Sequence, residues 1–244
     1  MIFKVKGMIG LFTKEYSFRY SDRDVNGNIK MSSVIDLLQD VSVSHTDSVG
    51  LTHEKLSSIP CAFLLEGWRI SVNHSLDPYK PASVKTGIMS FQRCQSIRKY
   101  EIWQDGICKI IATAVWFPVD TDKMKIIRAP EETISAYESV NEEDNGLKYI
   151  KLRPADDSVL SGEMNVEKRD LDTNNHMNNM KSAEAALSFL PDDFEIAELR
   201  IRYCKEIKRN DKIRFFTKTY ENTFSCEMKN ENDEICVLLS ADKK

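Results

Sequence analysis

The chain has 244 residues and a formal net charge of −4 at pH 7, with 41% hydrophobic and 30% charged residues. That length is enough for two domains with cores of their own, and that composition is typical of a globular chain rather than a disordered one. A net negative charge gives no attraction to nucleic acid, so we expect no nucleic-acid partner.

The amino-terminal residues and the cysteines indicate the cellular setting. Residues 1–15 contain an apolar patch that Lys4 and Lys6 interrupt, and it is too short and too charged for a signal sequence or a membrane span. None of the six cysteines stands in a CxxC pair, so the spacing typical of metal ligands is missing. We therefore expect a cytoplasmic protein with no metal, no cofactor, no disulfide framework and no stable membrane insertion.

The first half of the chain predicts a strand, a polar loop, a helix and four more strands. Residues 14–20 alternate as a strand does, and residues 21–30 form a loop rich in Asp, Asn and Gly. From Met31 the apolar residues take helical spacing, and Ser32 or Ser33 is expected to cap this helix. Strands are then predicted at residues 61–73, 83–93, 96–104 and 107–119.

The second half predicts the same order of elements. A strand is expected at residues 163–169, a polar loop at 170–176, and a helix whose apolar face begins at Met180 and which ends before Pro191. Further strands are predicted at residues 195–206, 212–221, 223–229 and 234–240. Between the halves the chain is polar and irregular, with an acidic run at residues 142–144.

The repeated order reflects an internal duplication. Residues 24–30 recur as residues 172–178, at a constant offset of 148. Where the second copy has His176, the first has Asn28. We therefore predict two like domains of the α+β class, at residues 1–128 and 163–244, which a linker at 129–162 connects. Only the second domain should carry a working site, because asparagine cannot exchange protons near neutral pH.

The polar loop of the second copy is the candidate site. Asp172, Asn174 and His176 alternate along an extended segment, so their side chains should project to the same side. They precede a helix whose first N–H groups are unpaired, which favours a developing oxyanion. Asp and Asn are also common caps and turn formers, and both copies keep them, so they have a structural alternative. His176 therefore carries most of the functional prediction.

Three segments of the chain resemble the acyl-ACP thioesterase family. The run from Asp172 to Asn179 reads Asp-x-Asn-x-His-x-Asn-Asn, which is similar to that family's signature. Residues 66–70 and the stretch 116–128 add to the resemblance, which extends over about residues 12–239. It implies two tandem hotdog domains, each a helix wrapped by an antiparallel sheet, with the two sheets joined edge to edge. It also implies hydrolysis of fatty acyl-ACP to free fatty acid and holo-ACP in fatty acid biosynthesis, with the first domain supplying the acyl-chain pocket.

The family also places a glutamate about thirty residues after its histidine. Glu206 holds that place here, and Ile207 replaces the cysteine that follows the glutamate in the plant enzymes. That departure disfavours a cysteine nucleophile at this position. Cys204 stays open as a nucleophile, since a strand running to residue 206 would place its side chain on the same face as Glu206.

The resemblance implies four catalytic residues, which are Asp172, Asn174, His176 and Glu206. In our hypothesis Asn174 and helix amides hold the thioester carbonyl and the water, and Glu206 takes a proton from that water. His176, oriented by Asp172, stabilises charge and protonates the leaving thiolate. A route through an anhydride of Asp172 remains open.

The partner implied is acyl carrier protein, which is acidic and needs a basic surface to dock. The basic residues expected to form that surface are Lys205, Lys208, Arg209, Lys212 and Arg214. Rival functions are an acyl-CoA thioesterase or hydratase of the hotdog fold, and a non-catalytic acyl-binding module. The last has no need of a histidine in one copy alone. The sequence leaves open the acyl chain length and the choice between monomer and homodimer.

Overall fold

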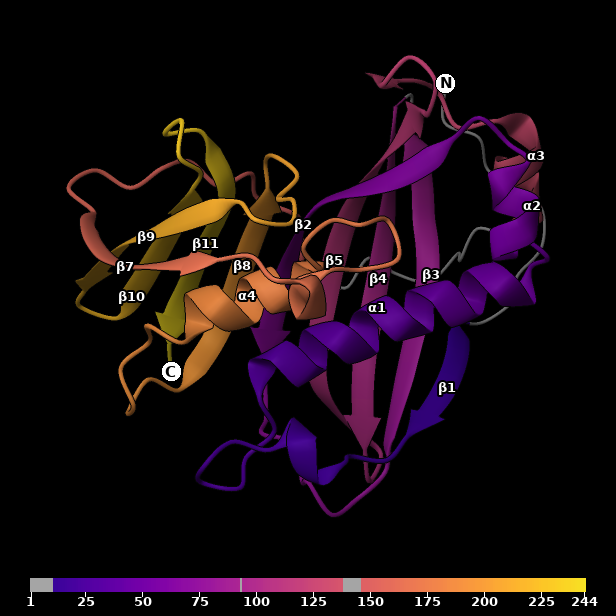
Figure 1. The fold of residues 1–244 in the computed structure, drawn as a ribbon. Coiled ribbons are helices and arrows are strands. Elements are labelled where there is room, and N and C mark those ends of the chain that lie inside the picture. Colours follow the sequence, from indigo (N-terminus) through magenta and orange to yellow (C-terminus); the bar gives the residue numbers. More distant parts are fainter. Residues whose placement is uncertain (1–10, 93, 138–145) are drawn as a thin grey trace. The chain divides into compact units, whose positions relative to one another are not determined.

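The computed structural model describes residues 11–92, 94–137 and 146–244, so the acidic run at 142–144 and most of the apolar patch at 1–15 lie outside the described residues. The chain divides into two compact units (Figure 1). The first unit is Met1–Glu66 with Asn73–Tyr149, and the second is Gly67–Val72 with Ile150–Lys244.

In the first unit one long helix lies across an antiparallel sheet (Figure 1). The neighbouring strands follow the order β1-β3-β4-β5, and β6 pairs with β5. The elements of this part of the chain are β1 (Phe12–Tyr16), the 3-10 turn η1 (Tyr20–Asp22), α1 (Met31–Ser48), α2 (His53–Ser57), β2 (Ala62–Val72), β3 (Ala82–Gln92), β4 (Gln95–Gln104), β5 (Ile107–Asp120), β6 (Lys125–Ile126) and α3 (Glu131–Ala136).

In the second unit a shorter helix packs against β10 and β11 of another antiparallel sheet. The strand order is β8-β11-β10-β9-β7, and Gly67–Ser71 of β2 pairs with Glu198–Arg202 of β8 inside this unit. Its other elements are β7 (Val159–Asn165), the 3-10 turn η2 (Lys168–Asp170), α4 (Asn179–Leu187), β8 (Ile196–Tyr203), β9 (Lys212–Tyr220), β10 (Thr223–Lys229) and β11 (Ile235–Lys243). Each unit therefore has the helix-on-sheet arrangement predicted for an α+β chain. No helix among the described residues is both long and apolar enough to cross a membrane.

Helical spacing of apolar residues explains how α1 packs. Val34, Ile35, Leu38 and Val41 fall on one face, and each is at most 2% exposed. The predicted serine cap is wrong, because Lys30 occupies the N-cap position and no side chain caps the helix. Serine is a favoured cap only where the backbone leaves the helix, and both serines lie inside the first turn.

The first strand of each half ends earlier than predicted. β1 ends at Tyr16, and β7 ends at Asn165, where the alternating pattern had suggested later ends. In both halves a 3-10 turn follows, in which an aspartate carboxylate accepts the N–H three residues earlier. These bonds are Arg19 N–H to Asp22 at 2.6 Å and Glu167 N–H to Asp170 at 2.8 Å. A local bond from side chain to backbone competes with the ladder and ends the strand.

A half-buried histidine lies on α1 of the first unit. The Nδ1 atom of His45 is 2.9 Å from a guanidinium nitrogen of Arg98, and its ring stacks on Phe12 with 5.2 Å between the centroids. Burial, followed by the charge of Arg98, lowers the pKa of His45 to about 4. The imidazole is therefore neutral in the folded protein at pH 7.

This shift predicts acid destabilisation. The pKa of histidine in the unfolded chain is near 6.5. Between about pH 6.5 and pH 4 the unfolded chain therefore binds a proton at His45, whereas the folded protein does not. The stability tied to the neutral ring is present above about pH 6.5 and is lost as the pH falls towards about 4. We expect the loss to be about 1–2 kcal/mol after allowance for solvent screening. Urea unfolding between pH 7 and pH 4 should show a weaker pH dependence in His45→Gln than in the wild type.

The exposed His53 offers a matched control. His53→Gln should leave the pH dependence of unfolding as it is in the wild type. Equal pH dependence in His45→Gln and the wild type would contradict this account of His45.

Candidate functional site

The polar loop after η2 is held in shape by Asp172. Its Oδ1 atom accepts the backbone N–H of Asn174 at 2.8 Å and that of His176 at 3.2 Å, while its own N–H donates to the His176 carbonyl at 2.8 Å. Asn175 lies in the left-handed region with φ of 63°, which asparagine tolerates better than most residues. These bonds fix the direction in which the chain presents His176.

The first unit builds the same loop with the same bonds. Asp24 Oδ1 accepts the N–H groups of Asn26 at 2.9 Å and Asn28 at 2.8 Å, and Asp24 N–H donates to the Asn28 carbonyl at 2.8 Å. Gly27 takes the left-handed conformation with φ of 83°, at the position that Asn175 has in the second copy. The helices that follow, α1 and α4, begin at positions 148 residues apart. The duplication predicted from sequence is thus present in the backbone, and the aspartate has a structural task in each copy.

The structure brings His176 and Glu206 together. The Nε2 atom of His176 is 3.1 Å from Oε2 of Glu206, with side chains that are 31% and 37% exposed. Backbone contacts hold the two segments side by side, because His176 and Lys208 form a β-bridge and Met177 N–H donates to the Ile207 carbonyl at 2.8 Å. An imidazole and a carboxylate at this distance can share a proton, and both side chains remain partly exposed to solvent.

Glu206 lies in a loop, not in a strand as we predicted. β8 ends at Tyr203, since the next two N–H groups, of Cys204 and Lys205, both point to the carbonyl of Cys236 at 2.7 and 3.2 Å. The argument that Cys204 shares a strand face with Glu206 therefore does not apply. The thiol of Cys204 is exposed, and its Sγ atom lies 4.0 Å from the Arg202 carbonyl.

The first unit has a counterpart of the Glu206 loop that the sequence analysis missed. After β2, the N–H groups of Asn73 and His74 both point to the Lys109 carbonyl, at 2.9 and 3.0 Å, as those of the second unit point to Cys236. The offset between these loops is 131 residues, so Ser75 stands where the second unit has Glu206. The sequence contains the pattern that would have revealed this correspondence, because Arg69-Ile70 recurs as Arg200-Ile201 at the same offset of 131 residues. The first copy therefore lacks both members of the pair, having Asn28 and Ser75.

The remaining predicted residues have different surroundings. The carboxylate of Asp172 bonds to loop backbone and to the Asn174 side chain, whose Nδ2 atom is 3.5 Å from Oδ2, rather than to the ring of His176. The side chain of Asn174 is exposed. At the start of α4, Asn178 caps the helix by accepting the N–H of Met180 at 2.8 Å, so one of the amides expected to face an oxyanion is already bonded.

Comparison with known families places this chain. The acyl-ACP thioesterase N-terminal domain matches residues 10–137, and the acyl-ACP thioesterase C-terminal domain matches residues 154–241. The chain belongs to the acyl-ACP thioesterase family. Among its relatives is a chloroplastic acyl-[acyl-carrier-protein] hydrolase of Cuphea viscosissima, 22% identical over 225 residues. The match covers 84% of this chain and 54% of the relative, so the chain spans about half the length of that protein.

Solved structures share the fold of this family member. An acyl-ACP thioesterase from Bacteroides thetaiotaomicron has a TM-score of 0.88 at 19% identity, with 96% of this chain and 98% of that chain covered. A 12:0-ACP thioesterase from Umbellularia californica has a TM-score of 0.84 at 16% identity, with 98% and 99% covered. The predicted tandem hotdog fold is thereby confirmed.

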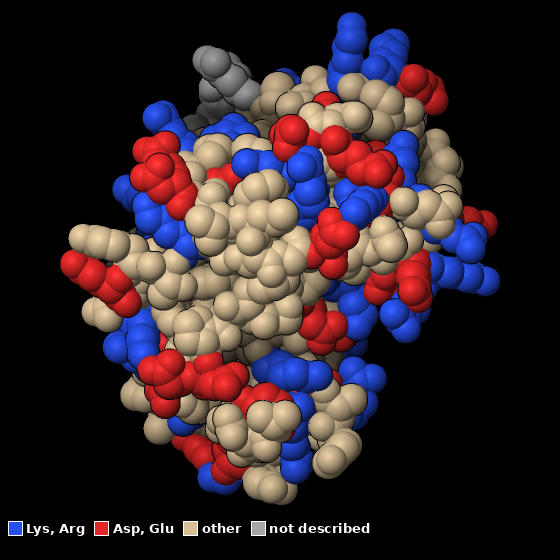
Figure 2. Space-filling view, turned by 60° about the vertical axis from the view of Figure 1, so that its left-hand side comes forward, with Lys and Arg blue, Asp and Glu red and all other residues tan. Residues whose placement is uncertain are grey.

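The five basic residues predicted for docking lie within eight residues of Glu206 in sequence, and most are already engaged. Three of the five predicted for docking form ion pairs: Lys205 with Glu234, Lys212 with Glu163 at 2.8 Å, and Arg214 with Asp233 at 2.8 Å. Within the described chain, Lys208 and Arg209 form no ion pair and are exposed. Figure 2 shows acidic and basic side chains mixed around a central area of other residues, with no large area of one sign on the displayed face. An attractive surface therefore has to come from a few exposed cations such as Lys208 and Arg209.

A hollow of about 460 Å³ adjoins Arg209. Its lining residues are Asn165, Val166, Glu167, Lys168, Arg209 and Asn210. The hollow therefore adds Lys168 to the basic groups beside the loop that carries His176.

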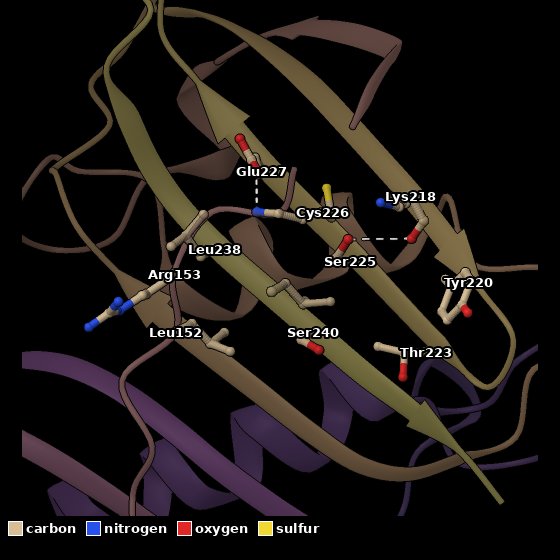
Figure 3. A pocket seen from close by; sticks show the side chains of 12 residues that line it. Leu152, Arg153, Lys218, Tyr220, Thr223, Ser225, Cys226, Glu227, Leu238 and Ser240 are labelled. Carbon is tan, nitrogen blue, oxygen red and sulfur yellow. Dashed lines mark hydrogen bonds between the residues drawn. The ribbon is translucent and has the colours of Figure 1, made fainter. Parts of the chain in front are cut away.

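A second pocket, of about 360 Å³, lies between residues 152–155 and strands β9, β10 and β11 (Figure 3). It includes none of the predicted site residues. Its buried carboxylate, Glu227, is ion-paired with Lys229 at 2.8 Å and accepts the N–H of Ala155 at 2.8 Å. Burial raises the pKa of the Cys226 thiol to about 12, which leaves it unreactive as a nucleophile. The pocket is not a candidate catalytic site.

Proposed function

We propose that this chain hydrolyses the thioester of fatty acyl-ACP in fatty acid biosynthesis, in the cytoplasm and as a monomer or homodimer. The observation that carries the proposal is the His176–Glu206 pair at 3.1 Å, which replaces Asn28 and Ser75 of an otherwise matching first copy. Family membership supports the substrate class. All six cysteines are free thiols, as is usual in the cytoplasm.

The pair can supply both proton transfers of thioester hydrolysis. Glu206 takes a proton from water, whose oxygen attacks the thioester carbon, and the C–S bond then breaks. His176 gives its proton to the departing thiolate, and a proton passing across the 3.1 Å contact restores both groups. The exposed amide of Asn174 holds the carbonyl oxygen as it gains charge. Asp172 acts as a positioning residue through the backbone of His176.

The test is thiol release from a panel of acyl-ACPs and the matching acyl-CoAs, with wild type and His176→Ala. We expect hydrolysis that prefers the carrier-protein substrates and is lost in the variant. Activity on CoA esters alone, or hydration of enoyl-CoA, would reassign the chain to one of the rival hotdog enzymes. Acyl binding without turnover would make it a binding module.

Docking of the acidic carrier protein should depend on Lys208 and Arg209. Both cations are exposed and without an acidic partner in the described structure, and Lys208 pairs with His176 through the backbone. We expect the KM for acyl-ACP to rise with ionic strength, and Lys208→Glu with Arg209→Glu to raise it about tenfold while kcat stays within about twofold.

The control reverses two exposed cations of the first unit, Lys123, which pairs with Asp120 at 3.4 Å, and Lys125, the first residue of β6. Lys123→Glu with Lys125→Glu gives the same change in net charge and should leave KM nearly unchanged. If KM is independent of salt, or if both double variants raise it equally, this docking site is wrong.

A further inference from the structure

Two segments of the first unit, residues 20–28 and the loop after β2, present large apolar side chains to solvent. Tyr20 is 91% exposed, Val25 is fully exposed at 101%, and Tyr79 is 81% exposed. We call these three residues the aromatic rim. Single exposed apolar residues are ordinary, but three at one place indicate a surface that meets a partner.

Arg23 contacts both segments that carry the aromatic rim. Its guanidinium carbon lies 4.4 Å from the centre of the Tyr79 ring, and one of its nitrogens donates to the Pro78 carbonyl at 3.2 Å. Its backbone N–H donates to the Tyr20 carbonyl at 3.3 Å. Arg23 also forms a β-bridge with Ile29, which closes the loop that carries Val25. The two loops that hold the rim are therefore fixed to each other.

The second unit shows that the loop itself does not need these side chains. At the corresponding positions, 148 or 131 residues later, it carries Lys168 for Tyr20, Thr173 for Val25 and Asn210 for Tyr79. The Asp24–Asn28 and Asp172–His176 loops have the same backbone bonds, so the difference there concerns what each loop presents to its surroundings. At the third position the backbone itself differs, because Asn210 is left-handed with φ of 69° and donates its N–H to the Val166 carbonyl, whereas Tyr79 N–H donates to Asp77. The second copy presents polar and basic groups, and the first presents rings and a branched aliphatic group.

The charged groups near the rim carry both signs, and several form ion pairs, such as Asp22 with Arg19 at 3.6 Å and Asp77 with Lys80 at 3.9 Å. Asp24 and Asp22 accept backbone N–H groups, and Asp77 accepts the N–H of Tyr79 at 2.9 Å. Lys80 bonds to Asp105 at 2.6 Å. A partner would therefore meet apolar surface and tyrosine hydroxyls, and it would gain little from charge.

We propose that the aromatic rim contacts the surface of a lipid bilayer. Tyrosine places its ring in the interfacial zone and its hydroxyl in water, and the fully exposed Val25, two residues after Arg23, adds an aliphatic side chain. Together the two tyrosines and the valine can bury roughly 400–600 Å² of surface. A stable protein interface buries about 800 Å² on each partner, so this area is too small for one but is enough for reversible membrane contact. The proposal does not depend on the catalytic assignment.

Sedimentation with phosphatidylcholine vesicles tests the proposal. We expect the wild type to bind, with little change between low and high salt. The variant Tyr20→Lys/Val25→Thr/Tyr79→Asn, which installs the residues of the second copy, should bind at least about tenfold more weakly. Its unfolding transition should stay close to the wild-type one, because all three side chains are at least 81% exposed and their replacement removes no buried group.

The matched control changes exposed apolar residues of the second unit, Val159 at 65% and Tyr220 at 64% exposure. Val159→Thr/Tyr220→Asn should bind vesicles as the wild type does. Absence of wild-type binding, equal loss in both variants, or binding only to anionic vesicles at low salt would each overturn the proposal. So would concentration-dependent dimerisation that only the rim variant abolishes, since it would assign the rim to a second copy of the chain.

Discussion

Glu206→Ala is expected to lower kcat for acyl-ACP about 10²–10⁴-fold, the usual range for loss of a general base. The carboxylate is 3.1 Å from His176 Nε2 and is 37% exposed, so its removal leaves no buried group unpaired. The melting temperature should therefore stay close to that of the wild type. His176→Ala should have a loss of similar size. The double variant should be no slower than the slower single variant, because the two groups act as one unit.

Two controls accompany this prediction, both read by steady-state kinetics with acyl-ACP. Glu231→Ala removes another exposed carboxylate of the second unit and should leave kcat unchanged. Cys204→Ser should also keep its turnover, since the thiol faces solvent outside the paired side chains. Near-normal turnover of Glu206→Ala would refute its assignment as the base. Inactivity of Cys204→Ser with normal Glu206→Ala turnover would move the chemistry to the thiol.

The second large effect is expected at Asp172, and the duplicated loop supplies its control. Asp172→Ala removes the acceptor for two backbone N–H groups and should cost about 1–2 kcal/mol of unfolding free energy. It should also lower kcat/KM about 10²-fold, because His176 loses its fixed position. Asp24 makes the matching bonds in the first unit. Asp24→Ala should therefore cost a similar free energy of unfolding while leaving kcat/KM almost unchanged.

Asp172→Asn separates positioning from direct chemistry. Asparagine keeps an oxygen that can accept the N–H groups of Asn174 and His176, so we expect kcat/KM within about tenfold of the wild type. An asparagine variant that is as stable as the wild type but as inactive as Asp172→Ala would establish the anhydride route instead. Urea unfolding and steady-state kinetics of the wild type, Asp172→Ala, Asp24→Ala and Asp172→Asn distinguish the positioning role from the anhydride route.

Features that the chain encodes locally were predictable from sequence. The Asp-x-Asn loops are built from bonds between residues two and four positions apart, so their repetition in sequence reappears as the same backbone in both units. Asp105 and Gly106 likewise form the turn between β4 and β5, with φ of 52° and 73°. Alternation and helical spacing located nearly all the strands and both long helices.

The misplaced features depend on distant parts of the chain. β8 ends where it does because Cys236, on another strand, receives two N–H groups at once. The contact between His45 and Arg98 joins α1 to β4. Ser75 was missed because the helix-to-strand connection is longer in the first half, which changes the offset from 148 to 131. The meeting of His176 with Glu206 was expected only from family resemblance, and no local pattern predicts it.

The division of β2 between the two units determines which fragments of the chain can fold when they are produced separately. Gly67–Val72 belongs to the second unit although it lies far before the rest of that unit in sequence. A fragment consisting of residues 150–244 would lack the segment that pairs with β8 and would present that strand's bare N–H and C=O groups to solvent. Such an open edge recruits strands from other molecules, so the carboxy-terminal half made alone should aggregate. Ribosomal synthesis avoids this, because residues 67–72 have left the tunnel long before β8 is made.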